Sequence, residues 1–220
     1  ESLQNYMHNL AVEVRNREQR ATEMRVATEL QRSILPRTDP SYGALAMRGW
    51  SLSSKEVGGD FYDYLTPDAN NLGIAIGDAV GKGLPAALMV TRCATLVRVY
   101  AEQGLLPDEI LGKVNRFLCR QLEGTGQFVT LFFGVVDMDK RLLRYSVAGH
   151  NPPLLIRGHS GQCTWLSSNE GLPLGIDEDV EFGNHEVKLH PNDTIVFYTD
   201  GITEAQNSME ELYGVERLRL

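Results

Sequence analysis

Three short segments of the sequence place an aspartate next to glycine at an end of an apolar stretch, and the aspartates are Asp60, Asp78 and Asp200. Glycine lets the backbone turn sharply and lets a ligand approach the neighbouring carboxylate and carbonyl oxygens. Carboxylates gathered without basic partners repel one another, so they either take up protons or share a hard cation. Oxygen ligands suit Mg²⁺ or Mn²⁺, whereas the scattered histidines and cysteines have no spacing typical of zinc. One such segment alone would indicate a turn, but three together predict a divalent-cation site.

The composition predicts a folded domain and argues against several classes of function. Of the 220 residues, 42% are hydrophobic and 23% are charged, as in an average globular protein. The formal net charge is −8, which argues against a nucleic-acid-binding protein because such a protein needs a concentrated basic face. No apolar run approaches the roughly 20 residues of a membrane-spanning helix, and the N-terminus does not resemble a signal peptide. The three cysteines are widely spaced, which favours a reducing, cytoplasmic setting.

The first 36 residues have a composition of their own. Residues 1–35 contain no glycine or proline and are rich in good helix formers, so we expect one long helix that ends before Pro36. Its heptad seams are interrupted at Arg17, Thr28 and Gln31. One interpretation is an amphipathic helix lying on its own domain. We favour the other, a coiled-coil regulatory linker that joins two copies of the chain, because about 50 Å of helix exceeds a domain of this size.

From residue 41 onward the apolar pattern changes to that of an α+β domain. Helical spacing covers 84–102 and 107–122, and a further helix is expected to begin near Met209. A run of strands, two helices and then many strands predicts antiparallel sheet with the helices outside it. The segments with strand patterning are 44–50, 61–66, 72–78, 128–137, 141–148, 153–157, 162–166, 185–189 and 194–199.

Taken as a set, six segments resemble the metal-dependent PPM-type (type 2C) protein serine/threonine phosphatases, in their bacterial SpoIIE/RsbU-like branch. Each segment alone is a weak signal, but all six occur in the order typical of the family and cover the chain from residue 27 onward. The segments are 27–36, 57–63, 77–83, 148–153, 171–175 and 198–204.

The resemblance implies a fold and a metal centre for residues 37–220. The fold is an α/β/β/α sandwich of two largely antiparallel sheets flanked by helices. In the centre, Asp78 would bridge two Mn²⁺ or Mg²⁺ ions, and the backbone carbonyl of Ala79 would bind one of them. Asp60 would contact one ion directly or through its water, and Asp200 would hold the other.

The resemblance also implies one further acidic ligand, which lies in an Asp-rich turn before a closing strand. The sequence ends at Leu220, before that turn. We therefore expect the phosphatase domain to be truncated ahead of its last metal-ligand turn and closing strand.

The implied reaction is hydrolysis of phosphoserine or phosphothreonine on a protein, by water whose pKa the two metal ions lower. The resemblance suggests a phosphorylated STAS-type anti-sigma-factor antagonist as substrate, in a bacterial partner-switching pathway. An alternative is a catalytically silent scaffold that binds the same kind of partner. The expected assembly is a homodimer through the N-terminal helix, in the cytoplasm, with room for an upstream sensor domain. Membrane attachment through a region outside this sequence stays open.

Two further residues have competing interpretations. Lys82 is a candidate contact for the substrate phosphate, although a solvated turn lysine fits the segment better, and the spacing of a Walker phosphate loop is absent. His150 is a candidate general acid, but we expect its ring to bond nearby backbone in a turn.

Gly58-Gly59-Asp60-Phe61 lacks the additional acidic residue of a diguanylate cyclase signature. The regulatory residues implied by the resemblance lie at the end of the linker and in the helix after Asp78: Leu30, Leu35, Leu84 and Met89.

Overall fold

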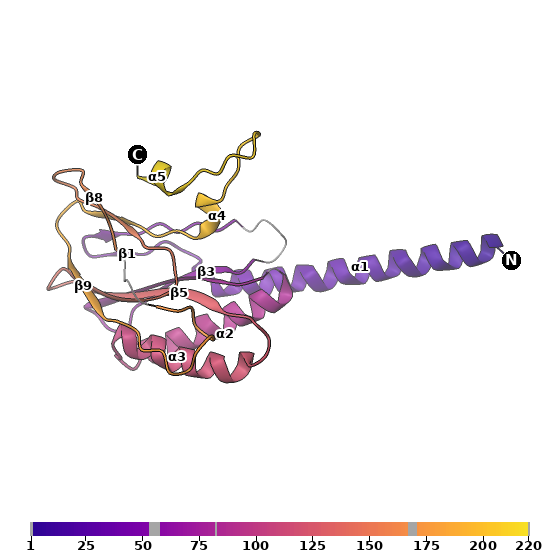
Figure 1. Ribbon diagram of the computed structural model, residues 1–220, viewed down its shortest axis with the longest axis horizontal. Helices are drawn as coiled ribbons and strands as arrows, with labels where there is room; N and C mark the ends of the chain where they lie inside the picture. The colour runs from indigo at the N-terminus through magenta and orange to yellow at the C-terminus, as the bar shows by residue number, and fades with distance from the viewer. Residues whose placement is uncertain (1, 53–57, 82, 167–170, 220) are drawn as a thin grey trace.

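The computed structural model describes residues 2–52, 58–81, 83–166 and 171–219 (Figure 1). Within the first helix it leaves out the side chains of 2–4, 20, 21, 23, 24, 26, 27, 30 and 31. The elements are α1 (Ser2–Ile34), β1 (Ser41–Tyr42), β2 (Leu45–Ala46), β3 (Asp60–Leu65), β4 (Asn71–Ala79), α2 (Leu84–Ala101), α3 (Pro107–Leu122), β5 (Val129–Asp137), β6 (Leu142–Ala148), β7 (Leu154–Ile156), β8 (Cys163–Trp165), β9 (His185–Lys188), β10 (Thr194–Val196), α4 (Asp200–Thr203) and α5 (Val215–Leu218).

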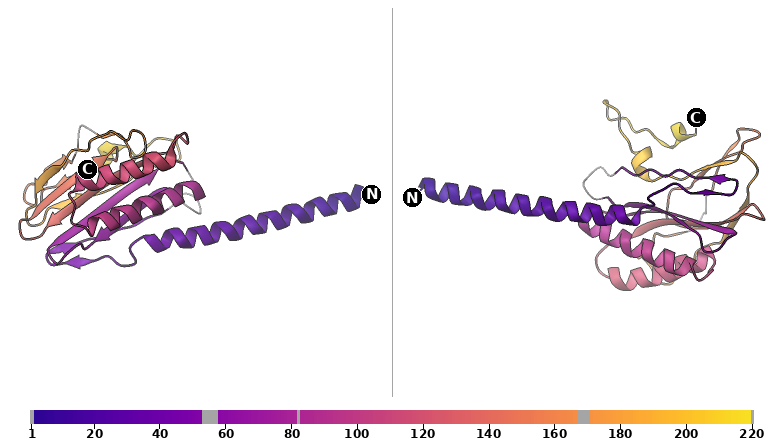
Figure 2. Two further views of the ribbon diagram at one scale, coloured as in Figure 1. Left: turned by 90° about the horizontal axis from the view of Figure 1, so that it is seen from below. Right: turned by 180° about the vertical axis from the view of Figure 1, so that it is seen from behind.

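The larger sheet has five antiparallel strands in the order β3-β4-β5-β6-β9. Because successive side chains in a strand point to opposite faces, β3 and β4 contribute to two cores. Phe61 and Ala75 pack with α2 and α3, whereas Tyr62 and Ile76 pack toward the smaller sheet. Both helices cover the first of these faces (Figure 2). Local sequence starts α3, because Pro107 is its first residue and the Glu109 side chain accepts a hydrogen bond from the backbone N–H of Leu106 just before it.

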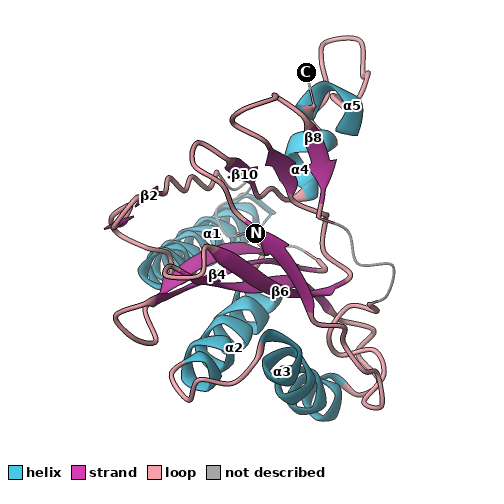
Figure 3. Ribbon diagram, turned by 90° about the vertical axis from the view of Figure 1, so that its left-hand side faces the viewer, coloured by secondary structure: helices cyan, strands magenta, loops and turns pink. Residues whose placement is uncertain are grey.

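The smaller sheet has three antiparallel strands in the order β10-β7-β8 and lies over the other face of the larger sheet (Figure 3). Phe132 and Tyr145 from the larger sheet and Leu155 from the smaller one are buried in the same inter-sheet core. The single-turn helices α4 and α5 lie beyond the smaller sheet (Figure 1). This order of layers confirms the predicted α/β/β/α sandwich, with the outer helical layer on the small-sheet side reduced to two four-residue helices.

Helix α1 confirms the predicted long N-terminal helix and projects away from the sandwich (Figures 1 and 2). Its C-terminal end packs on the domain, where Ile34 and Leu35 are half-buried against the core that contains α2. Proline at position 36 bars the preceding residue from continuing the helix. The coiled-coil linker over residues 1–36 remains a prediction.

Two of the predicted elements are wrong in detail. Of the segment 44–50, only Leu45–Ala46 forms a strand. No helix begins near Met209, because the Asn207 side chain accepts backbone hydrogen bonds from Met209 and Glu211 and closes a turn. The last helix starts only after Gly214, which has a φ of 77° and therefore is not in a helical conformation.

Among the described helices, α2 alone is long and apolar enough to cross a membrane by length and composition. Its apolar character has a structural explanation, since eight of its 18 residues are buried and its core residues pack with β3 and β4. The expectation that no segment is apolar enough to span a membrane is therefore corrected: α2 has the length and composition of a membrane-spanning helix, and it is a core helix in this fold.

Candidate metal centre

Asp60 and Asp78 lie directly opposite each other on the neighbouring antiparallel strands β3 and β4. Both are half-buried and lie toward the smaller sheet, one strand position from residues on the helix-covered face. The backbone N–H of Ala79 donates to the carbonyl of Gly59 at 3.0 Å, which continues the pairing past the end of β3. The hairpin therefore brings together two of the three aspartates that the sequence singled out.

Glycine at position 59 is required by the close approach of β4. A Cβ atom there would lie 2.5 Å from the backbone oxygen of Ala79 and 2.6 Å from Oδ1 of Asp78. Real Cβ contacts are never this short, so no side chain fits without displacing one of the two oxygens. The same measurement shows that the carbonyl oxygen of Ala79 and the carboxylate of Asp78 both lie against Gly59.

Asp200 joins this pair from the other sheet. The chain leaves β10, passes Thr199 and starts α4 at Asp200. The hydroxyl of Thr199 donates to Oδ2 of Asp60 at 3.2 Å, which connects the two sheets beside the carboxylates. Asp200 itself is exposed.

The three carboxylates influence one another electrostatically. Burial, together with the negative charges of Asp60 and Asp200, raises the pKa of Asp78 to about 7. Burial also raises the pKa of Asp60, with the Thr199 hydroxyl acting against it and the Asp200 charge adding to it. Carboxylates in such a position favour either a shared proton or a bound cation.

The donor set fits a hard divalent ion. Carboxylate and backbone carbonyl oxygens are the ligands that Mg²⁺ and Mn²⁺ prefer, and Asp78, Asp60 and the Ala79 carbonyl supply them. Among the residues that the structure describes, no three His, Cys, Asp or Glu side chains are close enough to hold a single ion. Asp200 is exposed at the start of α4, and its charge raises the pKa of both Asp60 and Asp78.

The other predicted residues lie around this centre or outside the described part. Lys82 falls outside the described residues, and so does the side chain of Leu30. Leu84 is exposed at the start of α2, whereas Met89 is buried in the core beneath it. Leu35 is half-buried on the same core, which places the end of α1 in contact with the α2 region.

The ring of His150 interacts with backbone, as expected, but with that of Tyr198 rather than that of its own turn, and the sequence did not indicate its side-chain partner. The ring is buried, and its Nδ1 atom lies 3.0 Å from the side-chain hydroxyl of Thr130. Thr130 lies opposite Asp78 on β5. A polar residue within the apolar segment 128–133 was the available signal, since a buried hydroxyl needs a partner.

Residues 68–219 match the family model described as stage II sporulation protein E (SpoIIE). The chain belongs to the SpoIIE family. This confirms the resemblance to the SpoIIE/RsbU-like branch and identifies a PP2C-type protein serine/threonine phosphatase domain. Asp78 and Asp200 lie inside the matched range, and Asp60 precedes it.

Relatives support the same assignment. The chain is 30% identical over 185 residues to phosphoserine phosphatase RsbU of Bacillus subtilis (strain 168), covering 84% of this chain and 54% of that protein. It thus spans about half the length of this relative.

Two solved structures share the fold of this SpoIIE-family chain. The SiaA-PP2C domain of Pseudomonas aeruginosa superposes with a TM-score of 0.76 at 24% identity, over 93% of this chain and 81% of that one. RsbX in complex with magnesium superposes with a TM-score of 0.57 at 18% identity, over 75% of this chain and 78% of that one.

Proposed function

We propose that this chain hydrolyses phosphoserine or phosphothreonine on a protein substrate, using two Mn²⁺ or Mg²⁺ ions. The observation that carries the proposal is the Asp60–Asp78 pair across β3 and β4 in a SpoIIE-family domain, with the Ala79 carbonyl next to Asp78. Metal dependence of the family and the magnesium complex of the fold neighbour RsbX support the cofactor.

Each residue has a distinct role in this proposal. Asp78 would bind both ions, Asp60 and the Ala79 carbonyl would bind one of them, and Asp200 would bind the other. When bound, the ions supply Lewis acidity that activates water and offsets charge on the phosphoryl oxygens. Thr199 keeps the Asp60 carboxylate oriented through its hydrogen bond, and Gly59 leaves the space that the Ala79 and Asp78 oxygens need.

The proposed substrate is a phosphorylated STAS-type anti-sigma-factor antagonist in a partner-switching pathway of the cytoplasm. Support comes from the relative RsbU, which is named a phosphoserine phosphatase, and from the relation of the family to partner-switching proteins. The chain covers about half of that relative. The proposal therefore also includes an upstream sensor domain and leaves open an attachment to the membrane outside this sequence.

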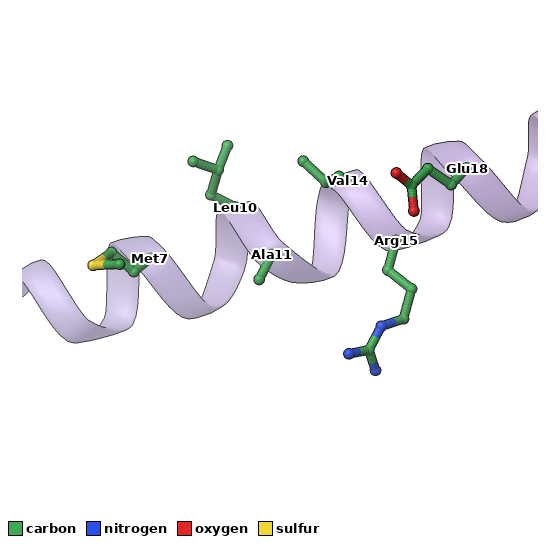
Figure 4. Close-up of a pocket in the computed structure, with 6 residues that line it drawn as sticks. All are labelled: Met7, Leu10, Ala11, Val14, Arg15 and Glu18. Carbon is green, nitrogen blue, oxygen red and sulfur yellow. The ribbon is translucent and has the colours of Figure 1, made fainter.

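We further propose that two copies pair through α1. Met7, Leu10 and Val14 recur at helical spacing and are 63%, 48% and 48% exposed, although such side chains are usually buried. They lie along one stretch of the projecting helix together with Arg15 and Glu18 (Figure 4). A second copy would cover these side chains and carry a change in helix packing to α2 through the contact at Leu35.

A catalytically silent scaffold remains the second candidate function. The observation that favours it is the exposure of Asp200, whereas Asp60 and Asp78 are half-buried. Such a scaffold would bind the same phosphorylated partner without hydrolysing it.

Release of phosphate from a phosphoserine peptide separates the two candidates. We expect turnover with Mn²⁺ or Mg²⁺, loss of turnover with EDTA, and no productive replacement by Zn²⁺. Asp179→Asn is the matched control, because Asp179 is exposed and away from the centre. Peptide binding without turnover at saturating Mn²⁺ would favour the scaffold, and turnover that resists EDTA would contradict the metal centre.

A further inference from the structure

His150 lies where the chain crosses from one sheet to the other. It follows β6 of the larger sheet and precedes β7 of the smaller one, and it is only 6% exposed. A bridge between Leu131 and Gly149 fixes the crossover against β5. The side chain is therefore a buried polar group between the two sheets. Burying such a group costs free energy unless it has a hydrogen-bond partner.

The partner on the larger sheet is Thr130, whose hydroxyl lies 3.0 Å from Nδ1 of His150. Thr130 is the residue paired with Asp78 in the β4–β5 register. Its hydroxyl is also 3.4 Å from the backbone oxygen of Asp78. The imidazole is thus one side chain away from the backbone that carries the central carboxylate.

The ring also faces the segment that leads to Asp200. Burial lowers the pKa of His150 to about 4, while an interaction with the backbone of Tyr198 acts in the opposite direction. Tyr198 is buried and precedes Asp200 by two residues. The Nε2 atom of His150 is buried and forms no hydrogen bond of standard geometry, so neutral imidazole is the form that suits this site.

We propose that His150 is a positioning residue that, through Thr130, fixes the separation between the Asp60–Asp78 pair on one sheet and Asp200 beyond the other. This inference rests on the proposed function, because it assigns His150 to the shell behind the metal ligands. It gives the histidine no direct role in proton transfer. Groups behind metal ligands commonly change metal affinity 10–100-fold when they are removed.

Four variants of the full chain separate positioning from packing. Thr130→Val removes the hydroxyl at nearly constant volume, and Thr130→Ser restores it. His150→Asn keeps an amide near the place of Nδ1, whereas His150→Gln places its amide near Nε2. His159→Asn is the matched control, because His159 is exposed.

Calorimetric titration with Mn²⁺ tests the positioning role. We expect Thr130→Val and His150→Gln to bind Mn²⁺ about 10–100-fold more weakly, with Thr130→Ser and His150→Asn within about threefold of wild type. The His159→Asn control should bind as wild type does. Wild-type Mn²⁺ affinity in a folded Thr130→Val variant would overturn the proposal.

Urea unfolding in EDTA tests the Thr130–His150 contact without any metal. We expect the Thr130→Val/His150→Gln double variant to be no less stable than the less stable single variant, because each removes the same contact. Fully additive losses of unfolding free energy in the two single variants would contradict the Thr130–His150 contact. Absence of Mn²⁺ binding by the wild type would overturn the proposed function together with the positioning role, while this unfolding cycle would still report on the contact.

Discussion

Two aspartates three residues apart on β3 lie on opposite faces of the larger sheet and have opposite surroundings. Asp63 is buried toward α2, where the Arg98 guanidinium lies 2.6 Å from its Oδ2 atom. Asp60 faces the smaller sheet, where its cross-strand neighbour is the carboxylate of Asp78. The negative charge of a carboxylate paired with arginine is already compensated, whereas two facing carboxylates need a proton or a cation to compensate theirs. The comparison identifies the second face as the functional one.

The largest expected effect comes from Asp78→Asn. The amide keeps the shape of the side chain but removes a charged ligand from the proposed two-ion centre. We expect kcat on a phosphoserine peptide to fall by about 10³-fold or more, which corresponds to about 4 kcal/mol. Circular dichroism should show an unchanged fold. Near wild-type turnover by the folded variant would remove Asp78 from the centre.

A pair of glycine substitutions sharpens the comparison. Gly59→Ala places a methyl group against the Ala79 and Asp78 oxygens, so we expect a loss of about 2 kcal/mol in stability and weaker Mn²⁺ binding. Gly112→Ala meets only the Arg116 side chain at 3.6 Å in α3. It should stabilise the protein by about 0.5–1 kcal/mol. Thermal denaturation of both variants measures the difference, and equal effects would contradict the crowding at position 59.

Arg98→Met tests the other face of the sheet. The variant leaves Asp63 buried without its partner, so we expect a loss of about 2 kcal/mol in unfolding free energy. Turnover of the remaining folded protein should stay within about twofold, because the ion pair is on the face away from Asp78. Urea denaturation and peptide turnover report the two quantities. A large fall in kcat without loss of stability would break the distinction between the faces.

The raised pKa of Asp78 also predicts a pH dependence of stability in EDTA. The folded-state pKa of Asp78 is raised to about 7 from 3.8, so folding favours its protonated form. Its contribution is fully present below pH 3.8 and is lost as pH rises to about 7. Wild-type stability relative to Asp78→Asn should therefore decline between those values. Parallel stability curves for the two proteins would contradict the raised pKa.

Much of the fold could be predicted because apolar periodicity depends on local sequence. The strand at 61–66 and the helix at 107–122 both occur close to where alternation and proline placement indicated. The helix expected near Met209 failed for a local reason as well: Asn207 captures backbone N–H groups that a helix would have used.

The site could be predicted only as a set of residue types. Asp60, Asp78 and Asp200 were singled out by glycine neighbours, but their approach depends on the β3–β4 register and on the packing of the two sheets. The Thr130–His150 contact joins residues 20 positions apart across a sheet crossover. No local pattern specifies such a contact, because it is fixed by tertiary packing.

Calorimetric titration of the metal-free chain with Mn²⁺, compared with Asp78→Asn and Asp179→Asn, tests the central claim most directly. The paired carboxylates of Asp60 and Asp78 predict saturable binding to the wild type, loss of that binding in Asp78→Asn and retention in Asp179→Asn. Equal Mn²⁺ binding by all three proteins, or none by the wild type, would contradict a metal centre between these strands.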